Sequence, residues 1–326
     1  MSTGGDSRKV VVAALAGNIA IAVCKFAAAY MSESTSTLAE AVHSLADTGN
    51  QALLLVGLRL AAKPPDDRFA FGRATEKYFW PFVVALILFS VGGAFAIWDG
   101  VSHAIHPPEH VGSPLWSYGV LGVSFLFESL SFRVAFREFK VMLKGKGWRE
   151  AILETRDPTI PLVLAEDATA LAGLTVALIA VGLSQITGKE LWDSLGSVLI
   201  GLLLCAVAYG LAKITHGLLI GESASAEDQA KVVDLAEGTP GVERITQILT
   251  MHLGPDVVIL SMKVAFRPKM EVEEVEETID EMERRIRKVM PQMRKIFIEP
   301  DSRGDGRGLK VAKSARAEQA AREESA

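Results

Sequence analysis

The chain has few cysteines, and its basic residues do not outnumber its acidic ones. Only two of its 326 residues are cysteines, Cys24 and Cys205, and they stand far apart in the sequence. Two isolated thiols provide neither a disulfide framework nor a thiolate metal cluster. Basic side chains number 34 against 39 acidic ones, which gives a formal net charge of −5. This acidic balance argues against a nucleic-acid partner.

Hydrophobic residues, by contrast, are abundant: they make up 49% of the chain, and its mean hydropathy is +0.27. They are concentrated in six blocks, roughly residues 10–30, 36–61, 78–103, 115–138, 159–185 and 190–215. Each block approaches or exceeds the roughly 20 residues that a helix needs to span a bilayer. The pattern predicts an α-helical membrane protein with six transmembrane helices. Buried core helices of a soluble protein are the less favoured alternative.

Basic residues alternate between the connections that join these blocks. They precede the first block and fill the second and fourth connections, whereas the first and third connections have none and the fifth has only Lys189. The positive-inside rule therefore predicts a multi-pass protein with both termini in the cytoplasm. The first block is long, contains Lys25 and has no convincing cleavage site, so we expect a span there and not a signal peptide.

The second block contains a polar stripe. Residues three and four apart share a helical face, and the stripe consists of Glu40, His43, Asp47 and Asn50. A carboxylate at membrane depth is costly unless it has a partner, so such residues usually mark an ion path. An imidazole and a carboxylate one helical turn apart can chelate a divalent metal. The stripe indicates a protein that moves a metal ion across a membrane.

After residue 220 the pattern becomes that of a small water-soluble domain. It predicts, in order, a helix capped by Ser225, strands at Val242–Leu253 and Val257–Phe266, a helix at Glu271–Met290 and a strand at Lys295–Glu299. The order αββαβ predicts a two-layer α+β domain with its helices on one face of the sheet. We therefore expect a transmembrane domain at 1–220, a cytoplasmic domain at 221–300 and a disordered tail at 301–326.

Three motifs together resemble the cation diffusion facilitator family, in its zinc transporter 9-like branch. They are Leu38-Ala-Glu-Ala-Val-His-Ser-Leu-Ala-Asp-Thr-Gly-Asn-Gln51, Arg156-Asp-Pro158 leading into Leu164-Ala-Glu-Asp167, and Asp193-Ser-Leu-Gly-Ser197. The resemblance covers nearly the whole chain to about Pro300. It implies a homodimer with six spans and a ferredoxin-like cytoplasmic domain that exports divalent cations, often zinc, in exchange for protons. Such a protein is not an enzyme and has no prosthetic group, because the metal is its substrate.

The resemblance also implies a set of metal ligands. The family's transport site takes two residues from span two and two from span five, often as His-x-x-x-Asp pairs. His43, Asp47 and Asp167 match this pattern, but Val163 stands where a second histidine would be. The fourth ligand stays open between Glu166, Asn50, Glu40 and water. Glu166 adjoins Asp167, although adjacent helical residues point about 100° apart.

These ligands bear on the metal and on proton coupling. One imidazole with carboxylates suits tetrahedral zinc, whereas manganese or ferrous iron accepts a more oxygen-rich shell. Metal binding requires neutral imidazole and ionised carboxylate, so protonation expels the metal. We expect a Zn²⁺/H⁺ antiporter that works by alternating access in the plasma or inner membrane of a bacterium. The alternatives are a manganese, iron or cobalt exporter of the same architecture, or a degenerate non-transporting scaffold, which Val163 keeps open.

Further metal sites are not expected. Phe69 and Arg73 stand where the family's cytoplasmic loop can have histidines, and His252 is the sole histidine of the cytoplasmic domain. We therefore expect this domain mainly to dimerise. Glu128 lies within the fourth span, and its role is open between pairing with a neighbouring helix and relaying protons.

Overall fold

The computed structural model describes residues 4–32, 35–106, 114–143, 157–189, 191–301 and the single positions 307, 309, 312 and 314. Within these ranges it describes every side chain except those at 4–10, 25, 28, 29, 31, 32, 35–43, 46, 114–117, 120 and 142. The chain divides into two compact units, Met1–His216 and Gly217–Ala326.

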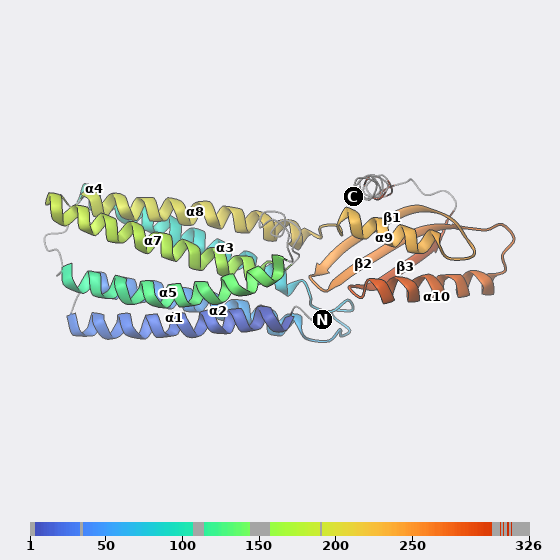
Figure 1. Cartoon of the computed structure of the whole chain (residues 1–326), viewed down its shortest axis with the longest axis horizontal. Coiled ribbons are helices and arrows are strands. Elements are labelled where there is room, and N and C mark those ends of the chain that lie inside the picture. The colour runs from blue at the N-terminus through green and yellow to red at the C-terminus, as the bar shows by residue number, and fades with distance from the viewer. Residues whose placement is uncertain are drawn as a thin grey trace. The chain divides into compact units, whose positions relative to one another are not determined.

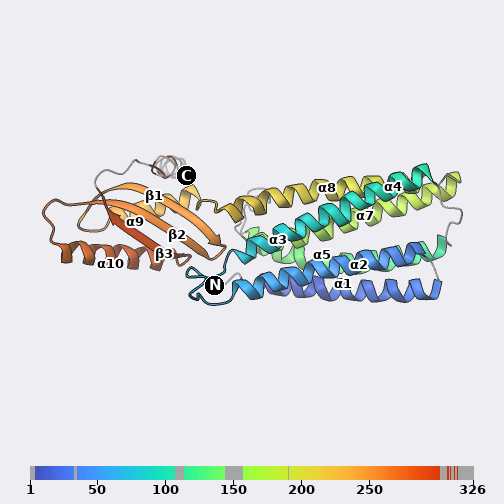
Figure 2. The same cartoon turned by 180° about the vertical axis from the view of Figure 1, so that it is seen from behind.

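The first unit is built from long helices that lie side by side (Figures 1 and 2). They are α1 (Gly4–Ser32), α2 (Thr35–Ala61), α3 (Glu76–Ile87), the π-helical segment η1 (Leu88–Ala94), α4 (Phe95–Ile105), α5 (Pro114–Leu143), α7 (Thr159–Thr187) and α8 (Leu191–Ile220). α3, η1 and α4 follow one another as one helical stretch of 30 residues. The helices agree in position with the predicted hydrophobic blocks.

Three helical stretches of the described chain are long and apolar enough to cross a membrane: Glu76–Ile105, Thr159–Thr187 and Leu191–Ile220. α1, α2 and α5 contain 29, 27 and 30 residues. At 1.5 Å per residue each exceeds the roughly 30 Å of a bilayer core. In α1 the described apolar stretch is Val11–Cys24, and six spans stay a prediction for these three helices.

Inside this unit, the apolar core lies where α1, α5 and α7 pack together with α2, α3 and α8. Its buried side chains include Leu54 of α2, Val84 of α3, Leu162 and Val163 of α7, and Leu211 of α8. Many large apolar side chains elsewhere on these helices are exposed, which is the surface that a lipid environment covers.

Glycines let α8 approach the η1 and α4 segments closely. A Cβ atom at Gly93 would lie 2.5 Å from the Sγ atom of Cys205, and one at Gly201 would lie 2.8 Å from the carbonyl oxygen of Gly93. At Gly100 it would lie 2.8 Å from the carbonyl oxygen of Ser194. Small residues permit such backbone contact between membrane helices.

The second unit has the predicted order αββαβ. Its elements are α9 (Ala226–Glu237), β1 (Val242–Gly254), β2 (Val257–Phe266), α10 (Val272–Val289) and β3 (Met293–Pro300). The sheet order is β1-β2-β3, with β1 and β2 antiparallel and β2 and β3 parallel. As predicted, the side chain of Ser225 caps α9, accepting a 3.1 Å hydrogen bond from the N–H group of Asp228.

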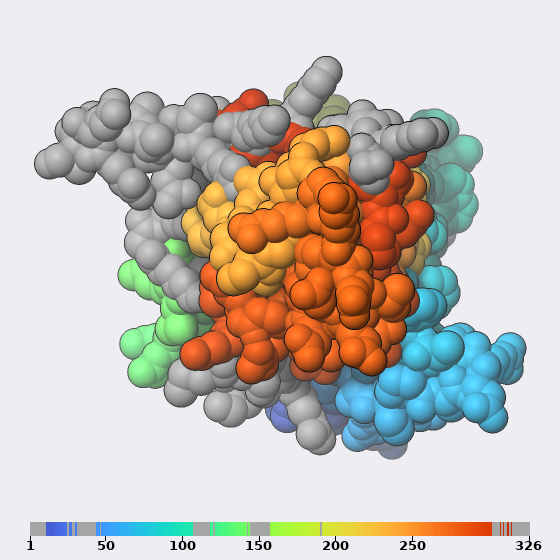
Figure 3. Space-filling view, turned by 90° about the vertical axis from the view of Figure 1, so that its right-hand side faces the viewer, coloured from blue at the N-terminus to red at the C-terminus, as the bar shows by residue number. Residues whose placement is uncertain are grey.

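The core of this unit lies between the sheet and its two helices. Leu260 and Met262 of β2 alternate with less buried residues and pack with Val232 of α9 and with Met282 and Ile286 of α10. Figure 3 shows one face of this unit, coloured from yellow through orange to red. The unit therefore has a hydrophobic core of its own.

Four positions of the predicted disordered tail, 307, 309, 312 and 314, are described by the structure. The N–H group of Ile248 on the edge strand β1 donates a 3.1 Å hydrogen bond to the carbonyl oxygen of Arg307. Leu309 packs against the core and Ala312 is fully buried. The backbone N–H groups of an edge strand are unpaired unless another segment covers them. Leu309 and Ala312, three residues apart, add an apolar contact between this segment and the core of the unit. The remaining tail positions lie outside the described residues.

Candidate functional site

The polar stripe of α2 faces the inside of the helical bundle where it is described. Asn50 and Gln51 are buried, and Asp47 is half-buried. His43 lies on α2 one turn before Asp47, and Glu40 lies a further turn away, but their side chains are outside the described part of the structure. The chelating pair of His43 and Asp47 therefore stays a prediction.

Glu166 and Asp167 are consecutive residues of α7, yet they contact different helices. The Nε2 atom of Gln51 on α2 donates a 2.9 Å hydrogen bond to Oε2 of Glu166. The hydroxyl of Ser131 on α5 donates a 2.8 Å hydrogen bond to Oδ2 of Asp167. Adjacent helical residues point about 100° apart, so α7 directs one carboxylate toward each neighbouring helix.

These carboxylates are near other negative charges. Asp47 repels both Glu166 and Asp167 electrostatically, and Glu128 of α5 repels Glu166. Asp167 is only 3% exposed. Carboxylates that share a buried site cannot all be ionised without compensation, so the arrangement favours a bound cation or bound protons.

Two oxygen atoms of this cluster are buried without any hydrogen-bond partner. They are Oε1 of Gln51 and Oε1 of Glu166. A buried acceptor without a hydrogen-bond donor lowers the stability of the fold by about 1–3 kcal/mol, because its desolvation is not compensated. Such atoms are rare in folded proteins and indicate a missing partner, such as water or an ion.

Val163 offers no donor atom at the place of the family's second histidine. Its side chain is fully buried and belongs to the apolar core with Leu54 and Leu162. Of the described candidate ligands, Asp47 interacts electrostatically with both Glu166 and Asp167. Asn50 is buried on the same helix as Asp47.

The described side chains do not form a closed metal site by themselves. Among them, no three histidine, cysteine, aspartate or glutamate groups are arranged so that they could hold a metal ion. A complete site therefore requires a further ligand, for which His43 is the prediction, or a movement of the helices.

Sequence reasoning missed two polar residues of this cluster, Gln51 and Ser131. Their spacing from known polar residues could have identified both: Gln51 stands four residues after Asp47, and Ser131 stands three residues after Glu128. On a helix these spacings place the paired side chains on a common face.

Side-chain contacts connect the loop between α2 and α3 to the start of α3. The guanidinium group of Arg73 lies 4.1 Å from the ring centre of Phe69, and its Nε atom lies 3.7 Å from Oε1 of Glu76. Oε2 of Glu76 accepts a 2.9 Å hydrogen bond from the indole of Trp80. A cation–π contact and an ion pair thus occupy the place where related loops can have histidines.

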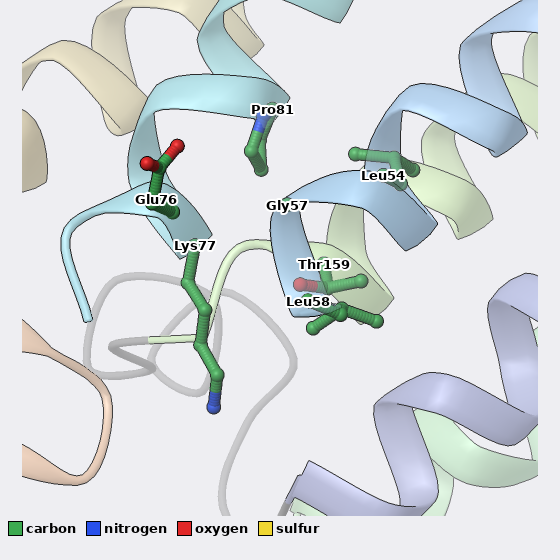
Figure 4. Close-up of a pocket in the computed structure, with 7 residues that line it drawn as sticks. All are labelled: Leu54, Gly57, Leu58, Glu76, Lys77, Pro81 and Thr159. Carbon is green, nitrogen blue, oxygen red and sulfur yellow. The ribbon is translucent and has the colours of Figure 1, made fainter. Parts of the chain in front are cut away.

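A shallow crevice lies near this loop, between α2, α3 and the start of α7 (Figure 4). It is lined by Leu54, Gly57, Leu58, Glu76, Lys77, Pro81 and Thr159. The charged ends of Glu76 and Lys77 point in opposite directions, away from its apolar part (Figure 4). The crevice shares no residue with the carboxylate cluster.

In the second unit, His252 is a buried residue of β1. Its Nδ1 atom lies 3.3 Å from the carbonyl oxygen of Gly254, and its backbone N–H group donates a 3.0 Å hydrogen bond to the carbonyl oxygen of Glu222. These contacts are those of a residue that supports the strand.

Comparison with known proteins agrees with this architecture. The cation efflux transmembrane domain matches residues 11–220, and the cytoplasmic domain of cation efflux proteins matches residues 224–303. The chain is 33% identical over 260 residues to the proton-coupled zinc antiporter SLC30A9, mitochondrial, of Xenopus laevis, a match that covers 79% of this chain and 46% of the relative.

Two other relatives widen the range of organisms. Metal tolerance protein C4 of Arabidopsis thaliana is 31% identical over 271 residues, which are 82% of this chain and 59% of that protein. Magnetosome protein MamM of Paramagnetospirillum magneticum is 22% identical over 312 residues, 92% of this chain and 90% of the relative. The chain spans about half the length of SLC30A9. Because the transmembrane match alone covers more than half of the chain, the protein belongs to the cation efflux, or cation diffusion facilitator, family of integral membrane transporters.

Proposed function

We propose that this protein exports a divalent cation, zinc in preference to others, in exchange for protons. The observation that supports it most is a pair of buried carboxylates on α7, Glu166 and Asp167, each hydrogen-bonded to a neighbouring helix and each repelled electrostatically by Asp47 on α2. Buried carboxylates that repel one another need positive charge, and a transported ion supplies it.

The proposed ligands are His43, Asp47 and Asp167, with Glu166 in fourth place and Asn50 as its alternative. Glu166 is preferred because its Oε1 atom is buried and has no hydrogen-bond partner, so it is available to a metal. One imidazole and three carboxylates can bind zinc in tetrahedral geometry. The printed name of SLC30A9, a proton-coupled zinc antiporter, supports the same ion and the same coupling.

Proton exchange follows from the ligands themselves. A carboxylate or imidazole binds either a metal ion or a proton, so protons that arrive at the site displace the metal. A site that opens alternately to each side of the membrane then exchanges the two. In this proposal no step requires a prosthetic group, and the protein is not an enzyme.

The proposed assembly is a homodimer with both termini in the cytoplasm. The matched cytoplasmic domain and its independent core support a dimer contact in the second unit. The alternation of basic residues between connections supports the orientation. The proposed location is the plasma or inner membrane of a bacterium.

A second candidate keeps the architecture and changes the ion to manganese, iron or cobalt. The excess of oxygen over nitrogen among the proposed ligands favours it, since these ions accept oxygen-rich, six-coordinate shells.

The experiment that tests both is cation flux in proteoliposomes. The full-length protein is reconstituted, and zinc, manganese, ferrous iron and cobalt are offered in turn while internal pH and internal metal are measured. Zinc-dependent proton flux is the expected result. A larger flux with another ion selects the second candidate, and neither metal nor proton flux with any ion would contradict transport and favour a scaffold role.

A further inference from the structure

We propose that Gln51 is a positioning residue that holds Glu166 in place as a ligand of the transported cation. This inference rests on the proposed function and adds a residue to its site. Its basis is the 2.9 Å hydrogen bond from Nε2 of Gln51 to Oε2 of Glu166, which links α2 to α7.

Gln51 is suited to this task because it is itself immobilised. Its side chain is 1% exposed, among the most buried large side chains of the protein. It stands one helical turn after Asp47 on α2, and residues four apart lie on the same helical face. A carboxylate bound to Gln51 is therefore held beside the helical face that contains Asp47.

Glu166 needs such a partner because of its position on α7. Asp167 contacts α5 through Ser131, and the preceding residue points about 100° away from it. The flexible side chain of a glutamate samples several rotamers unless a contact selects one. The hydrogen bond from Gln51 selects a rotamer directed toward α2.

The same hydrogen bond leaves one carboxylate oxygen unused. Gln51 occupies Oε2, whereas Oε1 of Glu166 is buried and has no hydrogen-bond partner. A carboxylate that donates one oxygen to a metal and accepts a hydrogen bond on the other is the usual arrangement at metal sites, where the outer partner fixes the ligand. Glu166 thus replaces the donor that Val163 cannot supply, and it does so from the next turn of α7.

A double-mutant cycle on cation binding tests this role. Gln51→Met and Glu166→Met each remove the hydrogen bond while keeping the length of the side chain. The full-length protein, purified in detergent, is titrated with zinc by calorimetry, and KM and maximal rate are measured in proteoliposomes. Thr215→Val is the matched control, because Thr215 is also buried but donates only within its own helix, to the carbonyl oxygen of Leu211.

We expect Gln51→Met to raise the Kd and KM for zinc about 10–100-fold, the range for loss of a residue that orients a metal ligand. The maximal rate should change much less, and Thr215→Val should bind zinc as the wild type does. In the Glu166→Met background, Gln51→Met should have little further effect, because its influence acts through Glu166.

Two results would overturn the proposal: wild-type affinity in Gln51→Met, or a double variant in which the two factors multiply. Multiplied factors would mean that Gln51 acts on the cation independently of Glu166. If Gln51→Met does not fold, Gln51→Leu replaces it in the same cycle. A wild-type protein that binds no divalent cation would refute the proposed function itself, a result that the cycle distinguishes from failure of the inference alone.

Discussion

The hydroxyl of Ser131 on α5 and the carboxylate of Asp167 on α7 form a 2.8 Å hydrogen bond between two buried side chains. The next residue toward the start of α7, Glu166, bonds to Gln51 on α2. Two consecutive residues of one helix therefore link it to two different neighbours. A movement of α7 relative to α2 or to α5 changes the corresponding contact.

Asp47→Ala should lower zinc flux by about 100-fold or more while expression and dimerisation stay near normal. Loss of an outer partner of a metal site already costs 10–100-fold, and Asp47 is a proposed ligand. Flux is measured in proteoliposomes. Asp99→Ala is the control, since Asp99 is a carboxylate of the same unit that is partly exposed and pairs with His103 at 3.3 Å. Near-normal flux in Asp47→Ala would remove the central claim of the proposed function.

Ser131→Ala should weaken zinc binding about 10-fold and leave the maximal transport rate nearly unchanged. The variant removes the donor that orients Asp167, and the ligand itself remains. Calorimetry on purified protein measures the Kd. Ser124→Ala is the matched control, because Ser124 is buried on the same helix one heptad earlier. Equal effects of the two variants would show that Ser131 contributes only to packing.

Gly93→Ala should destabilise the membrane unit by about 1–3 kcal/mol, the usual cost of overpacking. The new Cβ atom would lie 2.5 Å from Sγ of Cys205 and 3.1 Å from two backbone atoms of α8. Gly210→Ala on α8 is the control, because a Cβ atom there meets nothing within 4 Å. Thermal unfolding in detergent compares the two. A melting temperature of Gly93→Ala at or above that of Gly210→Ala would show that the two helices separate without cost.

Removing the residues after Asp301 should lower the stability of the isolated second unit by about 1–3 kcal/mol. The truncation exposes the surface that Leu309 and Ala312 cover and leaves the N–H group of Ile248 without its partner. Urea denaturation of Gly217–Ala326 and of a form ending at Asp301 measures the difference. Equal midpoints would mean that the tail contributes nothing to the fold.

The isolated second unit should fold without metal and bind zinc weakly or not at all. Its hydrophobic core consists of apolar side chains from both helices and all three strands, and His252 is its single histidine. Calorimetry tests this, with His252→Ala for comparison. Tight stoichiometric binding, with a large increase in stability, would contradict a domain that mainly dimerises.

The sequence by itself determined the elements of this protein and their order. Hydrophobic length and polar periodicity act within one segment, so they predicted α2, α7 and α8 and the αββαβ order of the second unit to within a few residues. Polar periodicity also identified Asp47 as a candidate site residue, because a carboxylate among apolar neighbours is recognisable within one segment. Glu166 and Asp167 became candidates only through the resemblance to the cation diffusion facilitator family.

Only the tertiary structure decided which partners these residues have. Glu166 and Asp167 are neighbours in the sequence, but the rotation of α7 directs one to Gln51 and the other to Ser131. The same rotation places Val163 in the apolar core. The composition around Ala312 is typical of a disordered tail, but Ala312 is fully buried in the core of the second unit. A pattern along one chain segment specifies which face is polar, whereas the identity of the opposing side chain depends on how separate helices pack against each other.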